Sequence, residues 1–254
     1  MPLSRDETDV LLNDFAVRSF RDVADHDYIA ARMAARARLI PQFLWSSLQA
    51  IEKYLKCILL LNRIKGRRVR HDLNTALRLI EEHARFKLLL KPRSVELIEH
   101  LDTYGRFRYL ETPYHVKGLE LIQLDLTVWS VRRYCRILDF EISWPAGGDR
   151  SKFEHRLRAI EASEAMPHRP FRLPGGALEK IIEDEEHPAR EPLLWKNMFF
   201  GWRPRTRVRF SPSFHATNSP LSMHPQILDE VLKYVYLPKE VVDHYRQRVE
   251  QVEK

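Results

Sequence analysis

The placement of proline divides this chain into two unlike halves. Ten of its 15 prolines lie between Pro145 and Pro225, and only four precede that stretch. Proline removes a backbone donor and clashes with the preceding helical turn, so long helices are expected only where it is rare. We therefore predict an all-α helical bundle over residues 1–143. Residues 144–254 are predicted to form a mixed, proline-rich C-terminal extension of loops, a short strand and terminal helices.

Apolar periodicity predicts the helices of the first half. An amphipathic piece covers residues 6–17. Five helices are expected to follow, over residues 21–39, 41–62, a stretch that starts at residue 73, roughly 92–104, and about 112–140. Pro41 and Pro113 suit the first turn of a helix, where the missing N–H is not needed.

The last of these predicted helices carries an unusually wide apolar face. One seam repeats at spacings of three and four residues, and a second seam lies beside it: Leu121, Leu124, Val128, Val131, Cys135 and Leu138, then Leu119, Ile122, Leu126 and Trp129. Two seams exceed what a single core contact needs. The face predicts a central helix, a subunit interface, or both, and we expect a homodimer through this region.

Charge suggests the class of partner. The net charge is +7, and the basic residues comprise 30 arginines against 12 lysines. The planar arginine fork matches phosphate oxygens, so an RNA or nucleotide partner is expected, although the same charge can serve solubility alone. Two basic stretches are predicted to contact phosphate: a loop with Arg67, Arg68 and Arg70, and an alternating strand "RPRTRVRF" with Arg205 and Arg207. In both, a solvated charged surface is the competing interpretation.

Several classes of protein are disfavoured. Cys57 and Cys135 are far apart in the sequence, and they provide neither a disulfide framework nor a zinc spacing. We find no metal-ligand pattern and expect no cofactor and no metal. The first residues do not resemble a signal peptide, and the longest aliphatic run, "CILLL", is too short to span a bilayer. We expect a cytoplasmic protein without a membrane partner.

Four stretches, in order, resemble one known family. They are "ADHDYIAARMAARA", "FLWSSLQAIEKYLKCILLLN" with its core "AIEKYLK", the tripeptide "HDL" at His71–Leu73, and "LDTYGRFRYLETPYH" before the last long helix. Together these residues, about 20–140, resemble the higher eukaryotes and prokaryotes nucleotide-binding (HEPN) family. The resemblance implies an up-and-down helical bundle that dimerises. Many members of the family are metal-independent ribonucleases with an R-x(4–6)-H motif. For this chain the resemblance therefore implies such an activity, a regulatory protein partner, and a role in defence or toxin–antitoxin systems.

The R-x(4–6)-H motif maps onto Arg108 and His115. Six Arg/His pairs in this chain have the required spacing, so only placement distinguishes them. Arg108 and His115 alone lie at the entrance to the last predicted bundle helix. His115 is then expected in the first turn of that helix, where backbone N–H groups and Arg108 would hold a phosphate. His71 and His100 are expected to be structural.

The sequence therefore predicts a metal-independent endoribonuclease. Histidine can act as general base or general acid near neutral pH, and arginine can stabilise charge on the phosphorane. A two-fold dimer would bring two histidines together, one for each proton transfer. Two other hypotheses remain open. One is a non-catalytic HEPN module that binds nucleotide, RNA or protein, and the other is an assembly protein that uses the wide apolar face.

Overall fold

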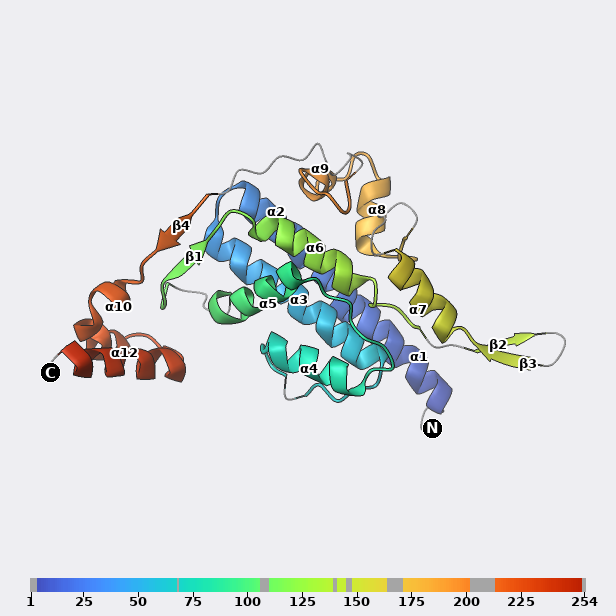
Figure 1. Cartoon of the computed structure of the whole chain (residues 1–254), viewed down its shortest axis with the longest axis horizontal. Coiled ribbons are helices and arrows are strands. Elements are labelled where there is room, and N and C mark those ends of the chain that lie inside the picture. Colours follow the sequence, from blue (N-terminus) through green and yellow to red (C-terminus); the bar gives the residue numbers. More distant parts are fainter. Residues whose placement is uncertain are drawn as a thin grey trace.

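The computed structural model (Figure 1) describes residues 4–67, 69–105, 110–138, 141–144, 148–163, 171–201 and 213–252. These residues are mostly helical, with two short two-stranded sheets, so the predicted all-α class is confirmed. Helices of the first half form a bundle. Figure 1 shows the C-terminal helices at one end of the molecule, joined to the bundle at strands β1 and β4.

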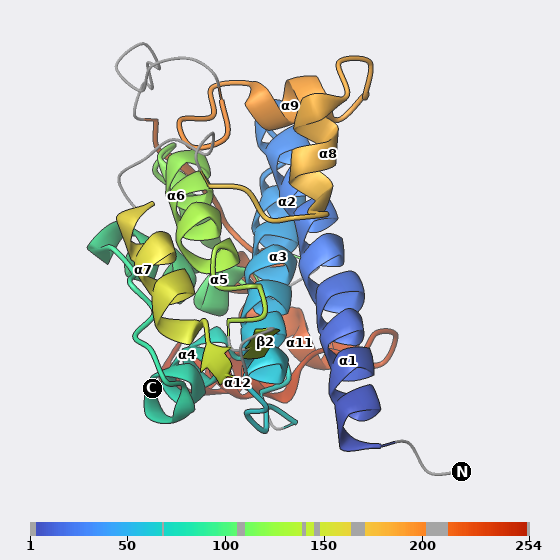
Figure 2. The same cartoon turned by 90° about the vertical axis from the view of Figure 1, so that its right-hand side faces the viewer.

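The first two predicted helical segments form one continuous helical rod. It consists of α1 (Arg5–Phe15), a π-helical stretch η1 (Ala16–Arg21) and α2 (Asp22–Arg36), and Figure 2 shows it running along the bundle beside α3. The rod begins with a capping box in which Ser4 Oγ accepts from the Glu7 N–H at 3.2 Å and Glu7 Oε2 accepts from the Ser4 N–H at 2.8 Å. These bonds satisfy backbone donors that have no partner within the helix.

Helix α3 (Ile40–Leu61) is central and packs against α2, α4 (Leu73–His83), α5 (Pro92–Tyr104) and α6 (Glu120–Arg132). Twelve of its residues are buried, which explains why its sequence is apolar on more than one face. Asp72 caps α4 by accepting a 2.7 Å hydrogen bond from the Thr75 N–H. The predicted helices at residues 41–62 and 92–104 are thus found within one residue of their expected bounds.

The helix predicted over residues 112–140 is much shorter than expected. Residues Tyr114–Val116 form strand β1, and α6 covers only Glu120–Arg132. Gly118 separates the two elements with a φ of +75°, a left-handed conformation that glycine adopts without strain. This conformation interrupts the helix that was expected to run through residue 118. Beyond Arg132 the chain leaves the helix, although Tyr134 and Cys135 stay fully buried.

The core does not end at the predicted boundary between residues 143 and 144. After the hairpin β2 (Glu141–Trp144) and β3 (Gly148–Ser151) come α7 (Phe153–Ala162), α8 (Ala177–Glu183) and α9 (Arg190–Leu194). Side chains from this stretch belong to the same buried cluster as the bundle, and they include Phe153, Phe171, Leu178, Leu193, Phe199 and Phe200. Figure 2 shows α8 and α9 against α2. Residues 153–163 and 171–200 therefore complete the bundle core.

The remaining described residues form a small unit with its own apolar cluster. It contains β4 (His215–Thr217), α10 (Pro220–Met223), a short 3-10 turn η3 (Pro225–Ile227), α11 (Leu228–Leu232) and α12 (Lys239–Val252). Its cluster contains Leu221, Leu228, Leu237, Val241 and Tyr245. The strand β4 pairs with β1, which ties this unit to the bundle.

Two reciprocal ion pairs join α2 to α6 inside the core. Arg132 Nε lies 2.7 Å from Asp25 Oδ1, and Arg32 forms an ion pair with Asp125. Both acids and both bases are almost fully buried. Two tyrosines complete the arrangement: Tyr54 donates to Asp25 and Tyr28 donates to Asp125, each at 2.6 Å. Buried charges are tolerated only when they are paired and hydrogen-bonded in this way.

The same charges hold residues 171–200 onto the bundle. Glu179 accepts from Arg132 NH2 at 2.6 Å, and the Leu178 N–H donates to Asp25 at 3.3 Å. Arg32 donates to the carbonyl oxygens of Pro192, at 3.1 Å, and Trp195. We call Asp25, Arg32, Asp125, Arg132 and Glu179 the charge network. Its arginines are therefore satisfied only when this stretch is in place.

The charge network makes the free energy of unfolding depend on pH in the acid range. Burial opposes the charged form of Glu179, but the Arg132 guanidinium and the Leu173 N–H outweigh it and lower the pKa from 4.5 to about 2. A lowered carboxyl pKa stabilises the fold above pH 4.5, and this contribution is lost as pH falls toward 2. It amounts to roughly 3 kcal/mol. We expect urea unfolding between pH 2 and pH 6 to show this loss, and a Glu179→Gln variant to show a flatter profile. An identical profile in the variant would contradict the assignment.

Candidate active site

His115 lies in a strand and not, as the sequence predicted, in the first turn of a helix. In β1 it is the middle residue and stands opposite Ala216 of β4, with Tyr114 opposite Thr217 and Val116 opposite His215. The pairing partner lies about a hundred residues further along the chain, so no local pattern around Pro113 reveals it. The proposed phosphate site at a helix N-terminus is therefore wrong for His115, because α6 begins only at Glu120.

A second histidine lies beside His115 within the same chain. His100 and Tyr104 are one turn apart on α5 and share one face, where their ring centroids are 4.8 Å apart. The His115 ring packs edge-on against both: its centroid lies 5.4 Å from that of His100 and 5.4 Å from that of Tyr104. We call His100 and His115 the histidine pair. It places two groups that can transfer protons side by side without a second subunit.

Burial gives the two histidines different environments. Within the part of the chain that the structure describes, Nε2 of His100 is buried and has no hydrogen-bond partner. Burial lowers the pKa of His100 below 6.5, nearby His115 and Lys117 lower it further, and the Glu120 carboxylate opposes the change. His100 is therefore neutral at pH 7 and able to accept a proton. His115 is only half-buried and faces the surface beside Phe214.

The segment that carries His115 is held at both ends. Glu120 is buried at the start of α6, and its carboxylate accepts from the Lys117 N–H. At the other end, the carbonyl oxygen of Glu111 accepts from Ser219 Oγ at 3.0 Å and from Tyr245 Oη at 2.8 Å. The C-terminal unit thus anchors the segment that carries His115.

The structure changes the role expected of His100. His100 was expected to be structural, but its ring contacts His115. His71, also expected to be structural, does not share this site and pairs with Glu52 at 2.8 Å. Two sequence signals pointed to His100: it is itself preceded by Arg93 at R-x(4–6)-H spacing, and Tyr104 follows it by four residues. Neither signal reveals that a distant strand brings His115 to the same face.

Of the arginines predicted to bind phosphate, only Arg67 and Arg70 lie within the residues that the structure describes. Arg108, Arg68, Arg205 and Arg207 lie outside the described residues, so their predicted roles stay predictions. Arg67 and Arg70 are exposed in the turn between α3 and α4, and Arg70 has a φ of +46°. This turn follows the end of α3 at Leu61, whereas the histidine pair lies on α5 and β1.

A cleft opens beside the histidine pair. It measures about 680 Å³ and is lined by the turn between α2 and α3, by the end of β1 and the start of α6, and by segments around Trp195 and Phe214. Phe214 is 72% exposed, and its ring stacks on His115 with centroids 6.0 Å apart. Arg38 and Lys196 contribute positive charge to the lining, and Glu120 contributes a carboxylate. We call this the Phe214 cleft.

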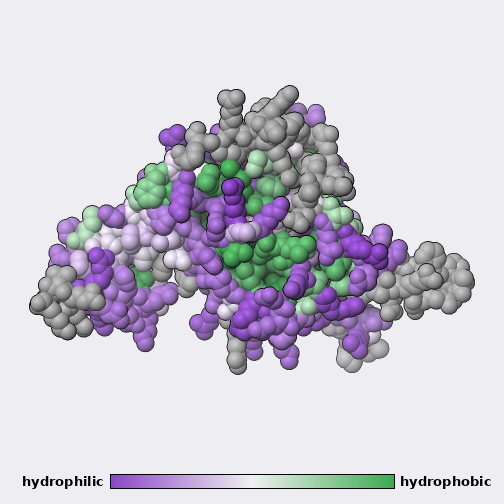
Figure 3. Space-filling model, in the orientation of Figure 1, coloured by the Kyte–Doolittle hydropathy of each residue, from purple (hydrophilic) through white to green (hydrophobic). Residues whose placement is uncertain are grey.

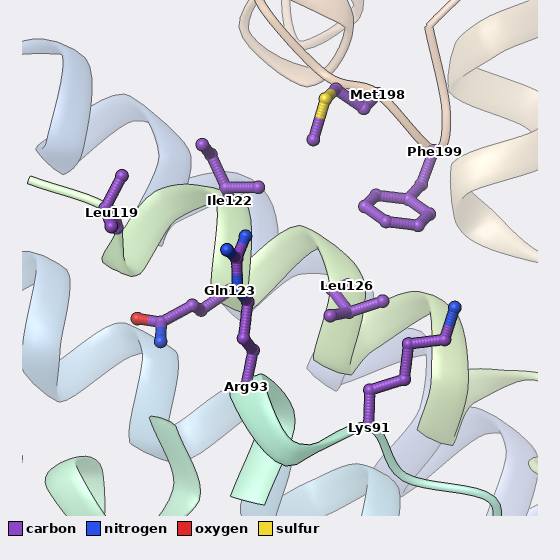
Figure 4. Close-up of a pocket in the computed structure, with 8 residues that line it drawn as sticks. All are labelled: Lys91, Arg93, Leu119, Ile122, Gln123, Leu126, Met198 and Phe199. Atoms are coloured by element: carbon purple, nitrogen blue, oxygen red, sulfur yellow. The ribbon is translucent and has the colours of Figure 1, made fainter. Parts of the chain in front are cut away.

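A second, more apolar pocket lies between α5 and α6. Figure 4 shows Ile122 and Leu126 of α6, and Leu119 just before it, with Met198 and Phe199 on one side of the pocket and Arg93 and Lys91 on the other. Its volume is about 350 Å³. Figure 3 shows hydrophobic residues gathered in the middle of the face seen in Figure 1, ringed by hydrophilic ones. Much of the predicted wide face is covered: Leu124, Val128 and Val131 are buried, and Trp129 packs against Phe171, Phe199 and Phe200 of the same chain.

Comparisons with protein-family models, with curated proteins and with solved structures found no match to this chain. In the described ranges no three His, Cys, Asp or Glu side chains lie close enough together to hold a metal ion. Of the helices that the structure describes, none combines the length and the hydropathy needed to cross a bilayer.

Proposed function

We propose that the protein is an endoribonuclease that cleaves RNA by transesterification at the histidine pair. The observation that carries this proposal is the 5.4 Å separation of the His100 and His115 rings beside an open cleft with positive charge at its rim. General acid–base catalysis needs one group that accepts a proton and one that donates it. Two adjacent imidazoles can fill both roles near neutral pH.

The proposed reaction assigns one role to each histidine. His100, which is neutral at pH 7, takes the proton of the RNA 2′-hydroxyl, directly or through a water molecule, and the 2′-oxygen attacks phosphorus. The bond between phosphorus and the 5′-oxygen breaks, and His115 acts as the general acid that gives a proton to that oxygen. The products are a 2′,3′-cyclic phosphate and a 5′-hydroxyl. Arg108 retains its predicted role of binding the phosphate, and the resemblance to the HEPN family remains an interpretation of the sequence.

The test is a cleavage assay on purified full-length protein. Single-stranded RNA of mixed sequence is incubated with the protein in EDTA, and the termini of the products are identified by mass spectrometry. We expect fragments that carry a 2′,3′-cyclic phosphate, because the nucleophile belongs to the RNA. Absence of cleavage for every RNA tested would replace this proposal with the second hypothesis, a module that binds RNA, nucleotide or protein without cleaving.

We also propose that two copies associate through the uncovered part of the α6 face. Val128 is fully buried in the core, so an acidic residue there would unfold the chain and report nothing on assembly. Ile122 lines the open pocket and is the better probe. We expect the parent to sediment as a dimer at micromolar concentration and Ile122→Asp to sediment as a folded monomer. A monomeric parent rules out this interface.

A further inference from the structure

The Phe214 cleft has the composition of a site for a single unpaired nucleotide. Its apolar lining includes Ile40, Phe43, Val116, Leu121 and the rings of Trp195 and Phe214, while Arg38 and Lys196 supply the positive charge. The Phe214 side chain is 72% exposed, so one face of its ring is open to a ligand in the cleft. Nucleobases stack on such rings regardless of sequence, and cations along the groove hold the backbone.

Electrostatics set the orientation of a nucleotide in the cleft. Glu120 is buried in the lining, and its carboxyl group disfavours a phosphate and favours hydrogen-bond donors of a ligand. Arg38 and Lys196 are exposed. A phosphate is therefore favoured next to the two cations, and a base is favoured further in, against Phe214.

The two cations occupy positions where glycine is usually preferred. Arg38 follows the last turn of α2 with a φ of +59°, and Lys196 follows α9 with a φ of +51°. Around Arg38, the Leu39 N–H donates to the Ala34 carbonyl at 2.9 Å, which is the pattern of a helix that ends in a left-handed residue. Any side chain with a Cβ at such a position costs backbone strain, and Arg63 and Arg70 have the same conformation away from the cleft. Glycine can therefore replace either cation of the cleft without loss of a favoured backbone conformation.

The cleft and the histidine pair meet at Phe214, which lines the cleft and also contacts His115. The Phe214 ring stacks on His115 with ring planes 27° apart, and Phe214 directly precedes β4, in which Ala216 stands opposite His115. We propose that the Phe214 cleft holds an unpaired nucleotide of the RNA, with its base on Phe214 and its phosphate at Arg38 and Lys196. This inference rests on the proposed function and deepens it, because it selects single-stranded RNA and positions a neighbouring phosphodiester at His115.

The test measures binding separately from cleavage. A fluorescently labelled 2′-O-methyl RNA oligonucleotide, which lacks the attacking hydroxyl, is titrated with full-length protein and followed by anisotropy at several salt concentrations. Phe214→Leu is expected to weaken binding of the single strand by roughly 5- to 100-fold, the range for loss of one stacked base. Phe214→Tyr should bind like the parent. The same oligonucleotide in a duplex should bind much more weakly than the single strand.

Glycine substitutions separate charge from stability. Arg38→Gly and Lys196→Gly should each weaken binding and reduce the slope of log affinity against log salt by about 0.7, the value for one phosphate contact on a single strand. Because glycine suits a left-handed position, the melting temperature should stay the same or rise. Arg63→Gly is the matched control: Arg63 has a φ of +56°, follows the far end of α3, and bonds Asp9 outside the cleft. It should bind like the parent.

Each outcome decides between the two proposals. If the parent does not bind the single strand, or if Phe214→Leu and both glycine variants bind as tightly as the parent, the cleft proposal is wrong. An equal loss in Arg63→Gly also overturns it, because the effect would then be one of total charge. If these variants lose binding while the parent cleaves no RNA, the cleft proposal stands and the endoribonuclease proposal fails. If the parent cleaves RNA while the variants bind as tightly as the parent, the endoribonuclease proposal stands and the cleft proposal fails.

Discussion

Alanine in place of either member of the histidine pair is expected to reduce RNA cleavage by about 10²- to 10⁴-fold, the usual contribution of one general acid or base. The two effects should not add, because each proton transfer depends on the other group being in place. His71→Ala is the matched control, since His71 is an exposed histidine that pairs with Glu52 away from the site. It should cleave at the parental rate.

The pH profile distinguishes a catalytic His100 from a structural one. Cleavage requires His100 to be neutral, and burial holds its pKa below 6.5. In the parent, kcat/KM should therefore decrease as the pH is lowered below 6.5, which gives the pH profile an acidic limb. In His100→Ala the residual activity should lose this limb, whereas a variant damaged only in its packing would keep it. Cleavage at the parental rate by His115→Ala would contradict the assignment of both residues.

Removal of the central arginine of the charge network is expected to have the largest effect on stability. Arg132→Met leaves the carboxylates of Asp25 and Glu179 buried without their ion-pair partner. Breaking a buried ion pair by removing one member typically costs about 3–5 kcal/mol, which is a large part of the stability of most domains. Urea unfolding monitored by circular dichroism measures the loss directly.

An exposed ion pair provides the comparison for that variant. Arg172 pairs with Glu183, and their side chains are 44% and 57% exposed. Arg172→Met should cost less than about 1 kcal/mol, because solvent screens the pair and the freed carboxylate is hydrated. If the two variants unfold at the same urea concentration, the buried pair does not stabilise the fold as its geometry indicates.

The sequence predicted helices well where one local pattern decides the structure. Residues 41–62 carry a long apolar face and residues 92–104 begin with proline at a tolerated position, and both helices are found as expected. The prediction was wrong at residues 112–119, because pairing of β1 with β4 is a contact between distant parts of the chain. Proline at a first helical turn and proline before a strand look alike in a local window.

The candidate site was only half predicted for the same reason. His115 was selected by its place in a motif, but its partner His100 is recognised only once α5 and β1 are brought together. The charge network was missed because helical patterns assign charged residues to the solvent face. A signal was present: Asp25 and Arg32 are seven residues apart, as are Asp125 and Arg132. Seven residues are close to two helical turns, so each pair lies along one face.

This matched spacing specifies the direction in which α2 and α6 can pack. In the antiparallel arrangement Asp25 meets Arg132 and Arg32 meets Asp125. If α6 ran the other way, each aspartate would face an aspartate and each arginine an arginine, in a water-free interior where like charges repel strongly. Displacing α6 by one turn along α2 would break both ion pairs between the two helices. The two helices are separated by more than eighty residues of chain. The two ion pairs therefore fix the position of α6 along α2, which apolar packing alone does not do.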